Sequence, residues 1–207
     1  MIKNLVFDIG GVLADFRIKE FLVEKGLDAE QIRRVLKASL KNPYWEKFEC
    51  GEVTEEEALQ AFAKADPEMD GAIRTAFANL DGMLVMKQET IPLLSGLKDA
   101  GYRVFYLSNY SKKAYDECGE SLAFMPCMDG GIVSFRVGMT KPDPAMYQYF
   151  LDLYRLKAEE CVFVDDTEEN VKVARELGFA GIVYRSHKEL KEELEAYGVE
   201  VGQEKSR

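Results

Sequence analysis

Five short apolar runs, rich in β-branched and aromatic residues, constrain the fold of this chain more than any other feature of its sequence. Continuous apolar runs of this kind are typical of strands that are covered on both faces. Helical patterns lie between the later runs, and this alternation indicates a parallel sheet with helices on both sides. We therefore predict an α/β protein with three layers. The runs cover residues 4–9, 103–109, 131–135, 161–166 and 180–184.

The helical patterns between the later runs begin and end at typical capping residues. Apolar residues recur with helical spacing in residues 89–101 and 169–178, and each pattern stops at a glycine. A third helix is expected within residues 141–154, with Asp143 as its N-cap and Pro144 as its first helical residue.

The segment from about residue 16 to residue 83 has a different pattern, because five helical candidates follow one another with no strand between them. Several begin with a capping residue, namely Asp28, Asn42 before a proline, Asp66 before a proline, and Thr54 in a capping box. The pattern predicts a small helical bundle inserted after the first strand. The candidates are residues 18–26, 28–41, 42–51, 54–65 and 66–80.

The expected domain organisation follows from these two patterns. Residues 1–14 and 84–207 are predicted to form the α/β core, and residues 15–83 are predicted to form a helical cap. The charged end of the chain, residues 202–207, is expected to be disordered.

The charge and hydropathy of the chain exclude several classes of function. The chain has 27 Lys and Arg and 37 Asp and Glu, which give a net charge of −10. This charge argues against sequence-independent binding of nucleic acid and against binding to an anionic membrane. No apolar run approaches the ~20 residues of a membrane-spanning helix. The N-terminal stretch lacks the layout of a signal peptide, so we expect a cytoplasmic protein.

The cysteines and the single histidine point to no metal or nucleophilic chemistry. The four cysteines lie at wide spacings, which favours reduced thiols over a zinc site or a disulfide framework. His187 lies late in the chain, where Ser186 or His187 is expected to begin a helix, so we favour a structural role for it.

Polar residues follow the predicted strands at the edge where α/β sheets bind ligands. Three carboxylates at one edge would repel one another unless a cation lay among them, and hard oxygen ligands suit Mg²⁺. A divalent cation, a lysine and a hydroxyl together form a site for phosphate. Each residue alone also fits a turn, a cap or a solvated surface, but their occurrence in this order favours a site. They are Asp8, Ser108, Asn109, Lys141, Asp165 and Asp166.

At these positions the chain resembles the haloacid dehalogenase (HAD)-like hydrolase superfamily, which has a Rossmann-like core. It is similar to the phosphatase branch with a helical cap after the first motif, and to glucose-1-phosphate phosphatase-like members. The resemblance covers nearly the whole chain. It rests on "VFDIGGVL" (6–13), "YLSN" (106–109), "VGMTKPDP" (137–144) and "FVDDTEENV" (163–171).

The resemblance implies a role for each of these residues. Asp8 is implied as the nucleophile that carries an aspartyl-phosphate. Lys141 would neutralise charge on the phosphate and the aspartates. The implied Mg²⁺ ligands are Asp8, the carbonyl of Gly10 and Asp166, with Asp165 as a catalytic partner beside them. Ser108 and the backbone amide of Asn109 would bind a phosphoryl oxygen, and Asn170 would touch a metal-bound water.

Position 10 departs from the pattern of most phosphatases of this family. They carry there a second aspartate, which protonates the leaving group, whereas this chain has Gly10. A missing general acid costs about 10² to 10⁴ in rate. The next acid along the chain, Asp15, is an alternative donor. Leaving groups that need little protonation would suffer least, and sugar phosphatases that resemble this chain share the glycine.

We therefore predict a Mg²⁺-dependent phosphatase that hydrolyses a small phosphorylated metabolite, with a sugar phosphate favoured. Two alternatives stay open. A metal-independent 2-haloacid dehalogenase also lacks the second acid, but it has little use for the adjacent Asp165 and Asp166. A phosphate-binding or regulatory protein would have the site without turnover.

The cap is expected to roof the site and to contact the substrate. Trp45, Phe48 and Tyr44 either line that roof or form the core of the bundle. Arg33 and Arg34 either meet a second anionic group or lie on an exposed helix face. The pattern leaves the identity of the ester and the oligomeric state open.

Overall fold

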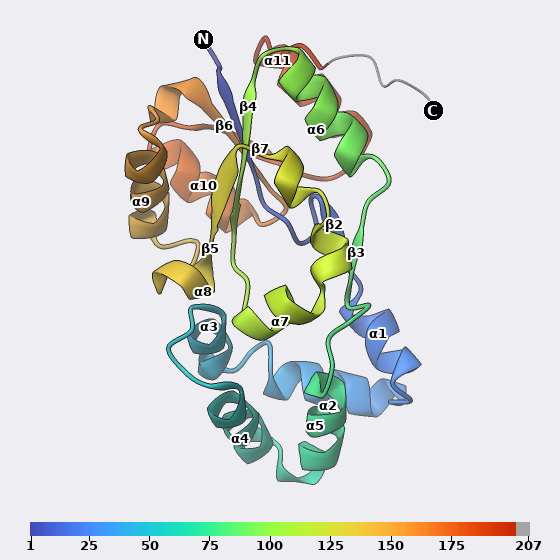
Figure 1. Cartoon of the computed structure of the whole chain (residues 1–207). Coiled ribbons are helices and arrows are strands. Elements are labelled where there is room, and N and C mark those ends of the chain that lie inside the picture. The colour runs from blue at the N-terminus through green and yellow to red at the C-terminus, as the bar shows by residue number, and fades with distance from the viewer. Residues whose placement is uncertain (202–207) are drawn as a thin grey trace.

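The computed structural model describes residues 1–201, and a five-stranded parallel sheet forms its centre (Figure 1). The strand order is β5-β4-β1-β6-β7, and every neighbouring pair is parallel. The predicted α/β fold and all five predicted strands are confirmed; the predicted disordered tail lies outside the described residues. The strands are β1 (Asn4–Phe7), β4 (Arg103–Ser108), β5 (Gly130–Val133), β6 (Cys161–Asp165) and β7 (Ala180–Val183).

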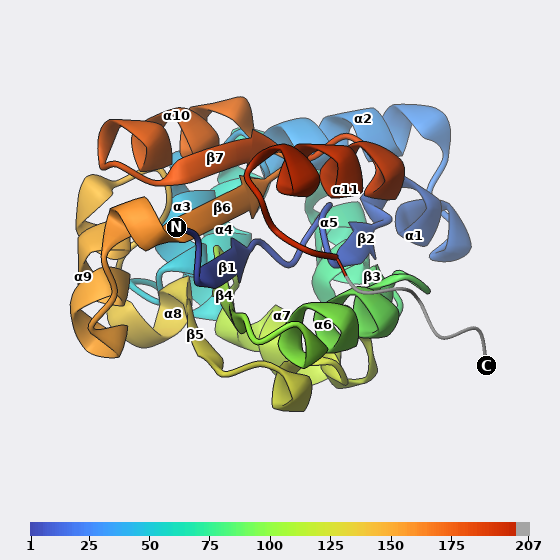
Figure 2. The same cartoon turned by 90° about the horizontal axis from the view of Figure 1, so that it is seen from above.

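Helices cover both faces of this sheet, as the continuous apolar runs require (Figure 2). Side chains alternate between the two faces along a strand, so Leu5 and Phe7 of β1 pack on one side and Val6 on the other. One face is covered by α9 (Pro144–Tyr154) and α10 (Glu168–Glu176), and the other by α6 (Thr90–Asp99) and α11 (His187–Ala196).

The predicted start of α9 is confirmed, because the Asp143 carboxylate accepts a hydrogen bond from the amide of Ala145. The third apolar run is shorter as a strand than predicted. Its last two residues, Ser134 and Phe135, begin the short helix α8 (Ser134–Val137). The remaining segments between β4 and β6 are α7 (Lys112–Glu117) and the 3₁₀ turns Gly119–Leu122, Met125–Cys127 and Ala158–Glu160.

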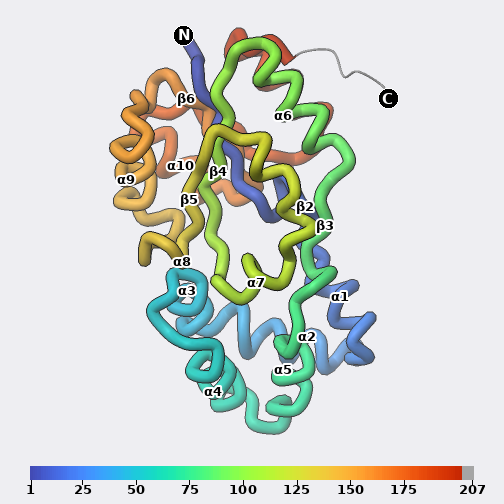
Figure 3. Tube along the Cα trace, viewed as in Figure 1, coloured from blue at the N-terminus to red at the C-terminus, as the bar shows by residue number. Residues whose placement is uncertain are grey.

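Five helices lie beyond the carboxyl ends of the sheet strands (Figures 1 and 3), and we call them the cap helices. The expected starts at Asp28, Asn42 and Thr54 are confirmed, since each side chain accepts a hydrogen bond from a backbone amide of its helix. A helical turn also begins after Asp66, as expected, but the Asp66 carboxylate accepts no hydrogen bond from that turn and pairs with Arg34 instead. The cap helices are α1 (Ile18–Glu24), α2 (Ala29–Ala38), α3 (Pro43–Glu49), α4 (Glu55–Ala65) and α5 (Asp70–Phe77), with a 3₁₀ turn at Pro67–Met69.

The cap helices have an aromatic core of their own. The ring centroids of Phe62 and Phe77 are 5.7 Å apart, and Trp45 lies 6.3 Å from Phe62 and 6.1 Å from Phe77. Phe48 is 6.3 Å from Trp45 and buried in the same cluster. Aromatic contacts at these separations add to the stabilisation from burial. The cap helices therefore hold together around aromatic side chains from α3, α4 and α5.

A short antiparallel ribbon, which the sequence did not predict, joins the cap helices to the core. It pairs β2 (Ala14–Phe16) with β3 (Leu84–Met86). The predicted domain boundaries, at residues 14/15 and 83/84, fall within this ribbon or beside it. The division into a core and a cap at those residues stays a prediction.

Within residues 1–201, no helix combines the length and the apolar character that crossing a bilayer requires. The four cysteines are free thiols.

Candidate active site

Three carboxylates meet at the carboxyl edge of the sheet. Asp8 follows β1, and its amide donates to the carbonyl of Val164 at 2.8 Å, which extends the strand pairing by one residue. Asp165 is the last residue of β6, and Asp166 follows it. Carboxylate oxygens of Asp8, Asp165 and Asp166 lie within 4.8 Å of one another. The structure thus brings together acids that are more than 150 residues apart in the chain.

Lys141 lies between two of these acids. Its ammonium Nζ is 2.9 Å from Asp8 Oδ1 and 2.6 Å from Asp165 Oδ2, and the residue is only 4% exposed. Asn109 fixes the backbone there, because the Lys141 amide donates to Asn109 Oδ1 at 2.8 Å and Asn109 Nδ2 donates to the Lys141 carbonyl at 2.9 Å. The side chain of Asn109 therefore positions Lys141, a role that sequence reasoning had not assigned to it.

The hydrogen bonds divide the three carboxylates into two kinds. Asp165 is fully buried, and both its oxygens are occupied by donors from Lys141, Asn170 and the Thr167 amide. Asp8 accepts at Oδ1, from the Ile9 amide at 2.8 Å and from Lys141 at 2.9 Å. Within residues 1–201, the one side-chain hydrogen bond to Asp166 comes from the Thr167 hydroxyl, at 3.4 Å. Asp165 thus acts as a fixed anchor for its neighbours, while Asp8 and Asp166 offer oxygen lone pairs to a ligand.

The electrostatics of the cluster favour a cation. Burial raises the pKa of Asp8 from its ordinary 3.8 to about 6, against the attraction of Lys141 and with the repulsion of Asp165. The pKa of Asp166 is also raised, mainly by burial and to a smaller extent by the repulsion of Asp165. Burial disfavours the charged form of Lys141, but the two carboxylates beside it outweigh that effect and raise its pKa. Three carboxylates thus share one ammonium, and the remaining negative charge suits a hard divalent cation with oxygen ligands.

Of the two glycines that follow Asp8, the backbone requires only one to be glycine. A Cβ on Gly11 would lie 2.1 Å from Asp166 Oδ2, and its φ of +77° is the left-handed conformation that glycine adopts most readily. A Cβ on Gly10 would meet no heavy atom within 4 Å. The backbone therefore requires glycine at position 11, whereas position 10 has room for a side chain.

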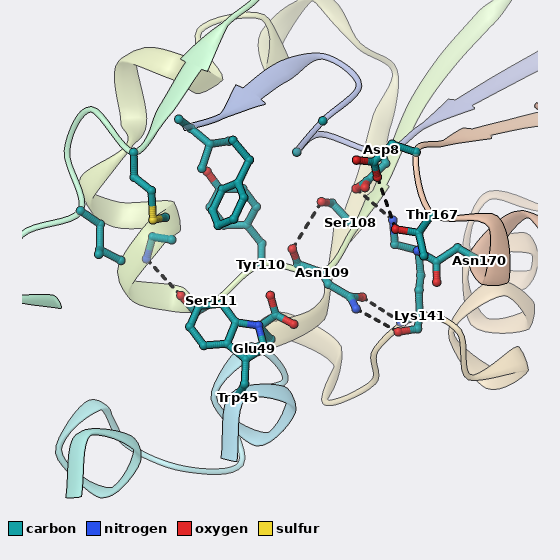
Figure 4. Close-up of a pocket in the computed structure, with 18 residues that line it drawn as sticks. Asp8, Trp45, Glu49, Ser108, Asn109, Tyr110, Ser111, Lys141, Thr167 and Asn170 are labelled. Carbon is teal, nitrogen blue, oxygen red and sulfur yellow. Dashed lines mark hydrogen bonds and ion pairs between the residues drawn. The ribbon is translucent and has the colours of Figure 1, made fainter. Parts of the chain in front are cut away.

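A pocket of about 290 Å³ separates this cluster from the cap helices (Figure 4). The cap side contributes apolar and aromatic surface together with one carboxyl group, that of Glu49. Most of the core side is polar and includes every residue that the sequence placed in the site except Asp165, which is buried behind it. The core residues that the sequence placed in the site and that line the pocket are Asp8, Gly10, Ser108, Asn109, Lys141, Asp166 and Asn170. The lining on the cap side includes Trp45 and Glu49, together with Phe16 of β2.

Of the three aromatic residues expected in the roof, one lines the pocket. Trp45 faces it, whereas Phe48 is buried within the cap and Tyr44 is exposed outside it. Neither arginine reaches the site: Arg33 pairs with Glu30 on its own helix, and Arg34 pairs with Asp66.

Two further residues that the sequence analysis considered lie away from the pocket. Asp15 is in β2, where its carboxylate forms an ion pair with Lys87, and it does not line the pocket. His187 is the first residue of α11, on the opposite side of the sheet from α9 and α10.

Sequence reasoning missed Glu49, Phe16 and Thr167 as lining residues. Glu49 and Phe16 lie far from the four motifs, and only packing of the cap helices against the core brings them to the pocket. Thr167 lies inside the fourth motif, directly after the acid pair, so its position in that motif was the available signal.

The chain belongs to the haloacid dehalogenase-like hydrolases, because the model of this family matches residues 2–178. It is therefore a hydrolytic enzyme by family, and the predicted family is confirmed. A crystal structure of a HAD family enzyme of Bacteroides thetaiotaomicron, in complex with magnesium and inorganic phosphate, is similar, with a TM-score of 0.68. That enzyme is 25% identical, and the match covers 90% of this chain and 96% of that chain.

Two phosphatases are similar over most of their length. A sesquiterpene phosphatase of Aspergillus oryzae is 27% identical over 180 residues, which are 87% of this chain and 88% of that enzyme. A D-ribitol-5-phosphate phosphatase of Bacteroides thetaiotaomicron is 26% identical over 192 residues, which are 86% of this chain and 90% of that enzyme. A drimenol cyclase of Aspergillus calidoustus is 28% identical over 94% of this chain, but the chain spans only 36% of that protein.

Proposed function

We propose that this chain is a Mg²⁺-dependent phosphatase that hydrolyses a small phosphate monoester through Asp8. The observation that carries the proposal is the convergence of Asp8, Asp166 and Lys141 on one pocket. The phosphatases among its relatives, and the similar enzyme that binds magnesium and phosphate, support the same reaction.

In the proposed reaction Asp8 attacks the phosphorus atom and forms an aspartyl-phosphate. Lys141 is well placed to support this step, because its ammonium already contacts Asp8 and would lie next to the transferred phosphoryl group. Ser108 is buried beside Asp8, and it would donate its hydroxyl hydrogen to a phosphoryl oxygen together with the amide of Asn109.

The donor set fits Mg²⁺. We propose Asp8, Asp166 and the carbonyl of Gly10 as the residues that hold the ion, with Asp165 anchoring Lys141 and Asn170 beside them. When bound, the ion would neutralise charge that develops on the phosphoryl oxygens. The two acids assigned as ligands are the ones whose oxygens are least occupied by protein donors.

We keep a sugar phosphate as the favoured substrate and the cytoplasm as the expected location. The Trp45 and Phe16 rings line the pocket, and aromatic faces suit the ring of a sugar. One similar enzyme is a D-ribitol-5-phosphate phosphatase and another is a sesquiterpene phosphatase, so both polar and apolar esters are candidate substrates.

The test is phosphate release from sugar phosphates, nucleotides, acyl phosphates and prenyl phosphates, each measured with Mg²⁺ and with EDTA. We expect Mg²⁺-dependent release that Asp8→Asn abolishes. Asp15→Asn serves as the matched control, because Asp15 is an acid near the first motif that lies outside the pocket. Release that is unaffected by EDTA, or that survives in Asp8→Asn, would contradict the proposal.

A further inference from the structure

The pocket contains a carboxyl group that none of the four motifs supplies. Of the carboxylates that line it within residues 1–201, Asp8 and Asp166 belong to the acidic cluster, and Glu49 comes from the end of α3. In Figure 4 the Glu49 carboxyl group extends from the cap side into the pocket, beside the Trp45 ring. An acid therefore faces the substrate space from the side opposite Asp8.

The backbone that carries Glu49 is tied to the core. The Ser134 hydroxyl donates to the Glu49 carbonyl at 2.6 Å, and the Thr140 hydroxyl donates to the Glu46 carboxylate at 2.8 Å. Thr140 precedes Lys141 directly, so the last turn of α3 is held next to the residue that contacts Asp8. These contacts fix the Glu49 backbone relative to the site.

We propose that Glu49 is the proton donor and acceptor of the reaction, in place of the aspartate that most phosphatases of this family carry at position 10. The inference rests on the proposed function. It accounts for two observations together: position 10 presents no side chain although it has room for one, and a carboxyl group lines the same pocket from the cap.

The proposed steps balance as follows. An Asp8 oxygen forms a bond to phosphorus, the bond from phosphorus to the ester oxygen breaks, and that oxygen takes the proton of the Glu49 carboxylic acid. The Glu49 carboxylate then takes a proton from water as the water oxygen bonds to phosphorus. The bond from phosphorus to Asp8 breaks, which releases inorganic phosphate and leaves Glu49 protonated again.

The environment of Glu49 suits this role. Burial raises the pKa of Glu49 from its ordinary 4.5 to about 7, and the hydrogen bond of the Trp45 indole opposes the rise. The negative charge of Asp8 raises the pKa of Glu49 further, and the positive charge of Lys141 lowers it. The negative charge of Glu46, on the same helix, also raises it. A carboxyl group with a pKa near neutrality is efficient both as a donor and as an acceptor of protons.

The first test compares leaving groups. We expect Glu49→Gln to lower kcat/KM for an alkyl phosphate, such as glycerol phosphate, about 10²- to 10⁴-fold. The loss for p-nitrophenyl phosphate should be under about tenfold, because its weakly basic leaving group needs little protonation. Glu52→Gln, which changes an exposed glutamate three residues away, is the matched control and should leave both rates unchanged.

Equal losses for the two esters, or a loss confined to KM, would make Glu49 a binding group and overturn the proposal. Unchanged rates in Glu49→Gln would overturn it as well. If the wild type released no phosphate from any ester, the proposed function itself would fail. A measurement of the charge on Glu49 that needs no turnover distinguishes that failure from a failure of the role proposed for Glu49.

The second test needs no turnover. Trp45 is the only tryptophan of the chain and neighbours Glu49, so its fluorescence should report the charge on that carboxyl group. In EDTA we expect the wild type to show an inflection near pH 7, and Glu49→Gln to lack it, while both unfold at similar temperatures. The same inflection in both proteins, or none in the wild type, would contradict the proposed protonation of Glu49.

Discussion

The carboxylate of Asp8 should make the metal-free protein less stable as the pH rises. Burial, opposed by Lys141 and reinforced by Asp165, raises the pKa of Asp8 from 3.8 to about 6. An acid with a higher pKa in the folded state is destabilising when it is ionised, so stability falls as the pH rises between the two values. The rise corresponds to about 3 kcal/mol once Asp8 is fully ionised, at about 1.4 kcal/mol per pKa unit.

The variant Asp8→Asn removes this cost, which is about 2 kcal/mol near pH 5 and about 3 kcal/mol near pH 7.5. Urea unfolding of both proteins in EDTA measures the difference between their free energies of unfolding. We predict that the difference shifts by about 1 kcal/mol in favour of Asp8→Asn from about pH 5 to about pH 7.5. Saturating Mg²⁺ should stabilise the wild type more than the variant, because the proposed metal site exists only in the folded protein and Asp8 is one of its proposed ligands. A difference that is constant or that shifts the other way over this range would refute the reasoning.

Two glycine variants test the geometry after β1. Gly11→Ala places a Cβ against the Asp166 carboxylate in a left-handed conformation, so we predict at least about tenfold weaker Mg²⁺ binding by calorimetry, and unchanged affinity would refute the assigned role of Asp166. A Cβ at position 10 meets no heavy atom within 4 Å, so Gly10→Asp in the Glu49→Gln background should raise kcat/KM for an alkyl phosphate at least about tenfold. A folded double variant with no gain would exclude position 10 as a place for the acid.

The parts of the site that the sequence predicted are those whose signals are local. Asp8 and the pair Asp165 and Asp166 directly follow apolar runs, so the end of each strand and the acid beyond it can be recognised together. Parallel pairing of β1 and β6 then places these acids at one edge. The sheet and its carboxylates could therefore be predicted before any coordinates.

What the sequence did not predict depends on partners distant in the chain. The strands β2 and β3 are three residues each and form only because they pair with one another. Asp66 has the local pattern of a helix cap, but Arg34, which is 32 residues away, pairs with its carboxylate. Glu49 reaches the pocket only through the packing of α3 against the core. Periodicity and capping rules carry no information on such contacts.

The position of β1 has a consequence for synthesis of the chain. Although β1 is translated before the other strands of the sheet, it lies in the middle of the sheet, between β4 and β6. Its second neighbour, Cys161–Asp165, is synthesised only after the more than 150 residues that separate it from β1. The buried residues Leu5, Val6 and Phe7 cannot pair on that side until β6 has been made, so during synthesis the central strand of the sheet lacks one of its two neighbours.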